Sequence, residues 1–227
     1  MAVHLSLPDA MPAFALRFVG QEALPPRLSD FDLEQFFPLL SDDVAAIQAQ
    51  FRSDHRLPAA LMLLFMRVAG RPLDGFNVLP RGLLRKTAEA LAVSPPSIAS
   101  LRSIYKRRQT LSKHQLWAKT YLGLRELAPD DEAALTATLL AQAADASHSD
   151  DLVQSACQWL FTRRILIPGA RRLQDWARAA YAAVEAQILS EVTAAVPPSA
   201  ASKVIDSAYS ARPNGDGTHL EWLKTPS

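Results

Sequence analysis

Apolar residues recur at helical spacing along most of this chain and leave little room for strands. One such run, which is Val44, Ile47 and Phe51, follows Ser41, an expected N-cap with two acidic residues after it. Alanine and leucine are abundant while glycine is scarce at 8 residues, which favours helix over sheet. The sequence therefore predicts an all-α fold.

The next predicted helix is the candidate for the buried centre of the first half. Pro58 at a first-turn position leads into Ala59–Val68, which is apolar nearly all round, and Gly70 ends it. The same reasoning predicts six further helices, over Leu83–Ala92, Ser94–Arg108, Ser112–Tyr121, Pro129–Ala144, Ser149–Phe161 and Arg171–Val192.

Turn-forming residues gather at the two ends of the chain. Residues 1–27 contain four prolines and are expected to be a flexible N-terminal segment. Residues 196–227, with Pro197-Pro198 and Asn214-Gly215-Asp216-Gly217, are expected to be a linker or truncated tail. Between them we place two helical domains, over residues 28–115 and 116–195.

Composition narrows the class of protein. Hydrophobic residues make up 49% of 227 residues, enough for a sizeable core. No apolar run reaches the length of a membrane span, and residues 1–20 lack the basic start of a signal peptide. The single cysteine, Cys157, excludes an internal disulfide and a cysteine-based zinc site, and it is expected to be a small buried hydrophobe. The expected compartment is cytoplasmic.

Charge is nearly balanced over the whole chain, at +1, but it is unevenly distributed. Residues 79–128 hold 10 basic and 2 acidic side chains, whereas residues 129–162 hold 6 acidic side chains and no basic one. A basic block inside a nearly neutral protein is the electrostatic footprint that a polyanion such as double-stranded DNA requires. The alternative is that these charges form only a solvated face.

The stretch 86–101 within the basic block is the most informative part of the sequence. A helix meets a three-residue break, Ala92-Val93-Ser94, whose serine is expected to cap a second helix with Ile98, Leu101 and Tyr105 facing the core. Two short helices joined by so tight a turn cross steeply, as in a helix-turn-helix unit. Bundles that never touch DNA also contain this geometry, but its coincidence with the basic block favours DNA binding.

The outer face of that second helix is the candidate reading surface. Ser100 and Ser103 are small enough to let the helix approach the floor of a groove, and Arg107 can bond a guanine edge. The run 106–108 would lie against phosphates, and His114 is either a further phosphate contact or an ordinary surface histidine. The predicted DNA contacts of this unit are Arg85, Lys86, Ser97, Ser100, Ser103, Lys106, Arg107, Arg108, Lys113 and His114.

A second, weaker helix pair follows downstream, over residues 149–161 and 171–192. The long helix is expected to turn Leu173, Trp176, Ala180 and Val184 inward, and Trp159 is likewise expected in the core. An ordinary amphipathic helix with exposed charges explains the other face nearly as well as groove binding does. The predicted DNA contacts of this unit are Arg163, Arg164, Arg171, Gln174 and Arg178.

Several motifs in order along the chain resemble the N-terminal region of Tn-three family transposases. They are Phe37–Arg71 with its segment Arg56–Ala60, Tyr105–Thr110 with His114, Tyr121–Arg125, and Leu160–Gly169 with Leu173, which is the most specific. The resemblance covers roughly residues 28–192 and, more faintly, residues 220–223. One departure is Pro58, which stands where the family pattern has glycine and bears on where that helix starts.

The resemblance implies replicative, cointegrate-forming DNA transposition. In such transposases the N-terminal region recognises terminal inverted repeats through tandem helix-turn-helix-like units, and a magnesium-binding Asp-Asp-Glu triad lies far downstream. The sequence stops at Ser227, so we expect a non-catalytic N-terminal fragment, truncated naturally or shortened by design, with no cofactor of its own. The expected partners are transposon ends, as double-stranded DNA, and the rest of the transposase chain, with homodimerisation left open for the full-length protein.

Catalysis by this chain finds little support in its residues. No glycine-rich phosphate loop or nucleophile elbow occurs, and the five histidines are scattered without metal-ligand spacing. Three acidic pairs, Asp42-Asp43, Asp130-Asp131 and Asp150-Asp151, stand at helix starts, where the helix dipole explains them. We therefore expect neither catalytic nor metal-binding residues. The alternative functions are a helical protein-interaction or scaffold module with a basic face, and a free-standing transposition repressor derived from the transposase.

Overall fold

The computed structural model describes residues 16–75, 78–213 and 217–224, and within them the regular elements are all helices. The prediction of an all-α chain is confirmed. Residues 1–15 of the predicted N-terminal segment and Asn214–Asp216 of the predicted tail lie outside the described residues. The helices are α1 (Asp30–Gln35), α2 (Ser41–Gln50), α3 (Ser53–Ala69), α4 (Arg81–Ala90), α5 (Ile98–Tyr105), α6 (Arg108–Leu122), α7 (Pro129–Ala143), α8 (Ser149–Thr162), α9 (Ala170–Ala195), α10 (Pro198–Tyr209) and α11 (His219–Lys224).

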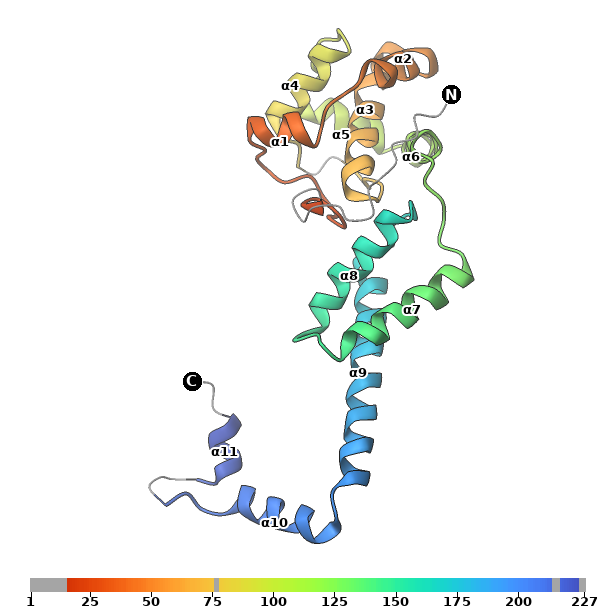
Figure 1. The fold of residues 1–227 in the computed structure, drawn as a ribbon. Helices are drawn as coiled ribbons and strands as arrows, with labels where there is room; N and C mark the ends of the chain where they lie inside the picture. Colours follow the sequence, from red (N-terminus) through yellow and green to blue (C-terminus); the bar gives the residue numbers. More distant parts are fainter. Residues whose placement is uncertain (1–15, 76–77, 214–216, 225–227) are drawn as a thin grey trace.

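The arrangement is elongated (Figure 1). Helices α1–α6 gather at one end, α7 and α8 pack with the first half of α9 beside them, and α9 then runs away from both groups. Helices α10 and α11 lie at the far end of α9, within the residues predicted to be a linker or truncated tail, and α10 has no buried residue. None of the helices in the described residues is both long enough and apolar enough to cross a membrane.

Helix α3 forms the centre of the first group. Every residue from Leu57 to Met66 is buried, which confirms the predicted buried helix, and the helix ends as predicted at Gly70, whose φ is +72°. The predicted start is wrong, because α3 begins at Ser53 and Pro58 lies inside it. The proline lies in the second turn of α3 and leaves the carbonyl of Asp54 without its i+4 amide donor.

The second group is a bundle of α7, α8 and the first half of α9 with its own apolar core. The core is built from Leu135 and Leu139 of α7, Leu152 and Leu160 of α8, and Leu173 of α9. These side chains recur at helical spacing on each element, so each helix turns a single stripe inward. The helix bounds in this region match the prediction to within a few residues.

A short N-terminal strap, residues 16–24, joins the two groups. Its Phe18 packs into the first core and its Val19 into the second, so this part of the predicted flexible segment is fixed in place. The amide of Gly20 donates a hydrogen bond to the carbonyl of Ala69 at 2.9 Å, and the amide of Ile167 donates one to the carbonyl of Gly70 at 2.9 Å. Backbone hydrogen bonds therefore tie the strap, the end of α3 and the loop after α8 together.

Candidate nucleic-acid interface

The connection between α4 and α5 is longer than the sequence pattern predicted. Helix α4 ends at Ala90 and α5 begins at Ile98, so seven residues separate them instead of three. Ser97 caps α5, because its Oγ accepts a hydrogen bond from the Ser100 amide at 3.1 Å, and the predicted cap at Ser94 is wrong. Two consecutive prolines follow Ser94, and a residue before proline is disfavoured in helical conformation, so the helix starts after them.

Helix α5 presents the two faces that the sequence predicted. Leu101 and Tyr105 are buried and Ile98 packs partly against the first core. Ser100 and Ser103 are exposed on the other side, with the Ser103 hydroxyl donating to the Ser100 carbonyl at 2.7 Å. The outer face of α5 at Ser100 and Ser103 is therefore polar and has small side chains.

Three consecutive basic residues, Lys106, Arg107 and Arg108, lie where α5 ends and α6 begins, and we refer to them as the basic junction. The helix that was predicted to continue through Arg108 ends at Tyr105. Arg107 is the N-cap residue of α6, and its backbone is extended, with φ −86° and ψ 102°. All three residues are exposed, as is Lys113 on α6. None of these four side chains takes part in an ion pair among the described residues.

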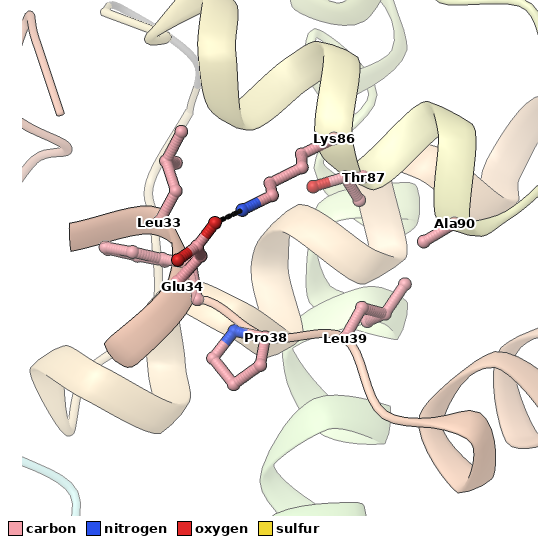
Figure 2. Close-up of a pocket in the computed structure, with 8 residues that line it drawn as sticks. Leu33, Glu34, Pro38, Leu39, Lys86, Thr87 and Ala90 are labelled. Carbon is pink, nitrogen blue, oxygen red and sulfur yellow. Dashed lines mark hydrogen bonds and ion pairs between the residues drawn. The ribbon is translucent and has the colours of Figure 1, made fainter. Parts of the chain in front are cut away.

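Other members of the basic block have acidic neighbours. Figure 2 shows Lys86 of α4 pointing to Glu34 of α1, with Nζ 3.3 Å from Oε1. The pair lies at the edge of a hollow of about 270 Å³ between α1 and α4. Arg85 forms a longer ion pair, with its Nε 3.8 Å from the carboxylate of Glu89. Some side chains of the basic block therefore have an acidic neighbour, whereas the ion pairs of the described residues do not include the basic junction.

His114 does not belong to the exposed surface. It is 1% exposed, its Nδ1 lies 3.0 Å from the hydroxyl of Tyr105, and its Nε2 lies 3.2 Å from Nδ1 of His55. Burial lowers the pKa of His114 to about 4, and the charges of His55 and Lys113 act in the same direction. Neither a phosphate contact nor an ordinary surface histidine fits this environment, so both interpretations of His114 are corrected. His114 lies four residues before Ala118, which is also buried, so the two share one face of α6. This spacing could have indicated from the sequence that His114 faces the core.

The second candidate surface lies at the start of α9. Arg171, Gln174 and Arg178 are exposed there, on the side opposite the buried Leu173 and Ala180. The three predicted contact residues therefore share a face, as expected, although Nη1 of Arg178 also lies 3.6 Å from Asp175.

The connection before α9 carries the other two predicted contact residues. Arg163 is exposed and its guanidinium lies 4.1 Å from the centre of the Trp159 ring. Arg164 is half-buried with a positive φ of +55°, and it belongs to the loop that pairs with residue 125. Trp159 and Trp176, expected in the core, are only partly buried, and each is covered by an arginine. The sequence did not anticipate this stacking of arginine on tryptophan, which stabilises exposed aromatic faces.

The acidic pairs at helix starts have one shared structural role. In α2, α7 and α8 the second acid of each pair accepts a hydrogen bond from the backbone amide three residues earlier, at 2.9, 3.0 and 3.1 Å. Capping therefore explains the pairs more specifically than the helix dipole alone. Within the described part of the chain, no cluster of His, Cys, Asp or Glu has the composition of a metal site.

Comparison with known proteins places the chain in a family. Residues 21–180, well over half of the chain, match a family described as a domain of unknown function (DUF4158), and the chain belongs to it. Over 206 residues, which are 91% of this chain, it is 32% identical to the transposase for insertion sequence element IS1071 in transposon Tn5271 from Comamonas testosteroni. The aligned region is 21% of that transposase, so the chain spans about a fifth of the length of this relative.

Proposed function

We propose that this chain binds double-stranded DNA at the terminal inverted repeats of a transposon, as a non-catalytic part of a Tn-three family transposase. The observation that carries the proposal is the 32% identity to a transposase over 91% of the chain. Transposition requires recognition of the transposon ends, and the aligned region contains both candidate surfaces.

The electrostatics of the basic junction support a phosphate contact. Lys106, Arg107 and Arg108 are exposed and stand next to one another, with Lys113 a little further along α6. Cations already bound to a carboxylate must give up that interaction before they reach a phosphate, whereas the junction has no such cost. Neutralising phosphates releases condensed counterions, so binding through the junction is expected to weaken strongly with salt.

The dimensions of α5 support groove entry. An α-helix with its side chains is about 10–12 Å across, which matches the roughly 12 Å width of the major groove. Ser100 and Ser103 face outward and would let the backbone approach the base edges. Arg171, Gln174 and Arg178 of α9 are the candidate contacts to a second stretch of the same repeat.

A fluorescence-anisotropy titration tests the proposal. The probe is a labelled duplex of about 40 base pairs from the end of the transposon that encodes the chain, and a scrambled duplex is the competitor. The end sequence is expected to win by roughly a thousandfold, the ratio typical of specific over non-specific binding. Equal affinity for both duplexes would refute the terminal-repeat specificity, and no binding at low salt would refute DNA binding altogether.

A triple variant then locates the contact. The variant has alanine at Lys106, Arg107 and Arg108. Its slope of log affinity against log salt concentration should be smaller in magnitude by about 0.9 for each phosphate that it no longer neutralises. The matched control removes the same charge from exposed positions elsewhere, at Arg27, Lys203 and Lys224. A decrease of equal size in both triple variants would assign the effect to net charge and not to the junction.

The alternative function is a helical protein-interaction module. The observation that favours it is a set of exposed apolar side chains on the second half of α9 and on α10, including Ile188, Leu189, Val204 and Ile205. Alanine substitution at Ile188 and Leu189 should leave DNA binding unchanged if the proposed function is correct.

A further inference from the structure

A line of polar side chains crosses the first core between α3 and the helices that flank the basic junction. The Tyr105 hydroxyl, at the end of α5, donates a hydrogen bond to the carbonyl of Pro58 at 3.0 Å. The same hydroxyl lies 3.0 Å from Nδ1 of His114 on α6, and Nε2 of His114 lies 3.2 Å from Nδ1 of His55 on α3. Tyr105 is 7% exposed and His114 is 1% exposed, so water does not compete for these bonds.

The direction of each hydrogen bond follows from the groups involved. A carbonyl only accepts, so the single hydroxyl proton of Tyr105 is used on Pro58. The hydroxyl oxygen then accepts from Nδ1–H of His114, and the bare Nε2 of His114 accepts from Nδ1–H of His55. This pattern requires a neutral His114, in agreement with a pKa that burial lowers to about 4.

We propose that Tyr105 and His114 are positioning residues, which hold the basic junction in place for phosphate contact by tying the helices on both sides of it to α3. The inference rests on the proposed DNA-binding function. Tyr105 directly precedes Lys106, and His114 follows Arg108 within the first half of α6. The two residues therefore bracket the three cations.

Apolar packing of Leu101 on α5 and Ala118 on α6 holds both helices to the first core, and the hydrogen bonds of Tyr105 and His114 add directional anchors on either side of the junction. Helix α5 has only eight residues, and α6 begins without a side-chain cap, since Arg107 occupies the N-cap position. Short helices are unstable in isolation. The carbonyl of Pro58 belongs to the stretch of α3 in which every residue is buried. Cations on a fixed backbone lose less conformational entropy on binding than cations on a mobile one.

The same two residues carry one of the motifs that resemble transposases, Tyr105–Thr110 with His114. From the sequence alone, the basic residues of this motif and His114 are predicted to be DNA contacts. The structure separates the motif into an outer group, which is the basic junction, and an inner group, which is the tyrosine and the histidine. The spacing of the motif is then the spacing needed to anchor both ends of a basic turn.

The test compares Tyr105→Phe with a core variant of similar expected cost, Ile47→Val, in the full chain. Ile47 is fully buried on α2 and is absent from the hydrogen-bond line. Both variants are first confirmed to be folded at the assay temperature by circular dichroism. Binding to the 40-base-pair end duplex is then measured over a series of salt concentrations.

We expect Tyr105→Phe to weaken binding about tenfold at low salt and to lower the slope of log affinity against log salt by about 0.9 for each phosphate that the junction no longer neutralises. Ile47→Val should keep the wild-type affinity and slope. A purely structural tyrosine would change stability but leave the slope of the folded protein intact, so wild-type slopes in both variants would overturn the inference.

Rescue at His114 provides a second criterion. His114→Leu removes both hydrogen bonds, whereas the amide group of His114→Asn can still donate to the Tyr105 hydroxyl in place of Nδ1–H. We expect the asparagine variant to recover most of the salt slope that is missing in the leucine variant. Equal slopes in the two variants would contradict a positioning role for this hydrogen bond.

Amide hydrogen exchange separates failure of this inference from failure of the proposed function. Tyr105→Phe should speed exchange of the amides of residues 106–112 by about tenfold, while Ile47→Val should not, whether or not DNA is bound. Unchanged exchange would overturn the positioning role alone. If the wild-type chain does not bind DNA, the phosphate role of the junction is refuted together with the proposed function, and exchange then reports only how the turn is anchored.

Discussion

Arg67 of α3 and Asp43 of α2 form a pair of hydrogen bonds between guanidinium and carboxylate, at 2.9 and 2.6 Å. The aspartate is 2% exposed and accepts two further hydrogen bonds, from the Leu40 amide at 2.9 Å and from the Tyr121 hydroxyl at 3.1 Å. One carboxylate therefore caps α2 and links it to α3 and α6. Breaking such a pair by removing the buried carboxylate is costly, because the partly buried guanidinium then lacks its partner.

Asp43→Ala should destabilise the protein by about 3–5 kcal/mol, because it leaves the Arg67 guanidinium partly buried without its carboxylate and removes the cap of α2. Asp42→Ala is the matched control, since its side chain is exposed at the neighbouring position and should cost less than about 1 kcal/mol. Urea unfolding followed by circular dichroism at pH 7 measures both. Similar decreases in stability in the two variants would contradict the role assigned to Asp43.

Gly70→Ala should destabilise the contact between the two groups of helices, α1–α6 and α7–α9. The φ of +72° costs an alanine about 1–2 kcal/mol, and its Cβ would lie 2.8 Å from Cδ2 of Phe161 and 2.9 Å from Cδ1 of Ile167. Gly75→Ala is the control, because a Cβ there lies within 4 Å of none of the described residues. Thermal unfolding should show a lower midpoint for Gly70→Ala only, and equal midpoints would refute the close approach.

Acid should destabilise the protein through His114. Its pKa is lowered to about 4 in the folded state, whereas an unfolded histidine has a pKa of about 6.5. Between these values the unfolded chain binds the proton more readily, so stability falls as the pH decreases from about 6.5 to about 4, by up to about 3 kcal/mol.

Urea unfolding between pH 7 and pH 5 isolates this effect, because the carboxylates titrate at lower pH. His114→Asn should remove most of the stability change across this range. His148→Asn is the control, since His148 is exposed at the start of α8, and it should keep the wild-type dependence. A wild-type dependence in His114→Asn would show that another group is responsible.

Cys157 should resist thiol reagents until the protein unfolds. It is 3% exposed against Gly20 of the strap, and burial raises the pKa of its thiol to about 11, so almost no thiolate is present at pH 8. Ellman's reagent should therefore label the chain at the rate of unfolding. Ser202→Cys supplies an exposed thiol on α10 as the control for fast labelling. Immediate reaction of Cys157 in the native chain would contradict the docking of the strap on α8.

Much of the candidate site was visible in the sequence, because exposure of a charge follows from its place on a helix. The three residues of the basic junction were predicted to be DNA contacts, Arg107 with a guanine edge as well as with phosphate, and all three side chains are exposed in the structure. The break in the helix at Lys106 was not predicted, nor was the burial of His114. Beside them the Tyr105 hydroxyl reaches the carbonyl of Pro58, 47 residues away in the chain, a contact that no local pattern specifies.

The sequence by itself determined the fold class and most of the helices. Apolar periodicity, Gly70 at the end of α3 and acidic residues at the helix starts act within four or five residues of one another, so they can be found without knowing the fold. The consecutive prolines 95 and 96 are a local signal of the same kind, because they explain why α5 begins at Ile98 and not at Ser94.

Only the tertiary structure decided which distant groups meet. The pairing of Asp43 with Arg67, the docking of the strap on α3 and the hydrogen bond from Tyr105 to Pro58 each join segments more than 20 residues apart. No local pattern specifies such partners, because they are selected by the path of the chain and by the need of buried polar groups for hydrogen bonds. His114 shows both effects, since the packing of α6 on α3 places it in the core and its two ring nitrogens are hydrogen-bonded there.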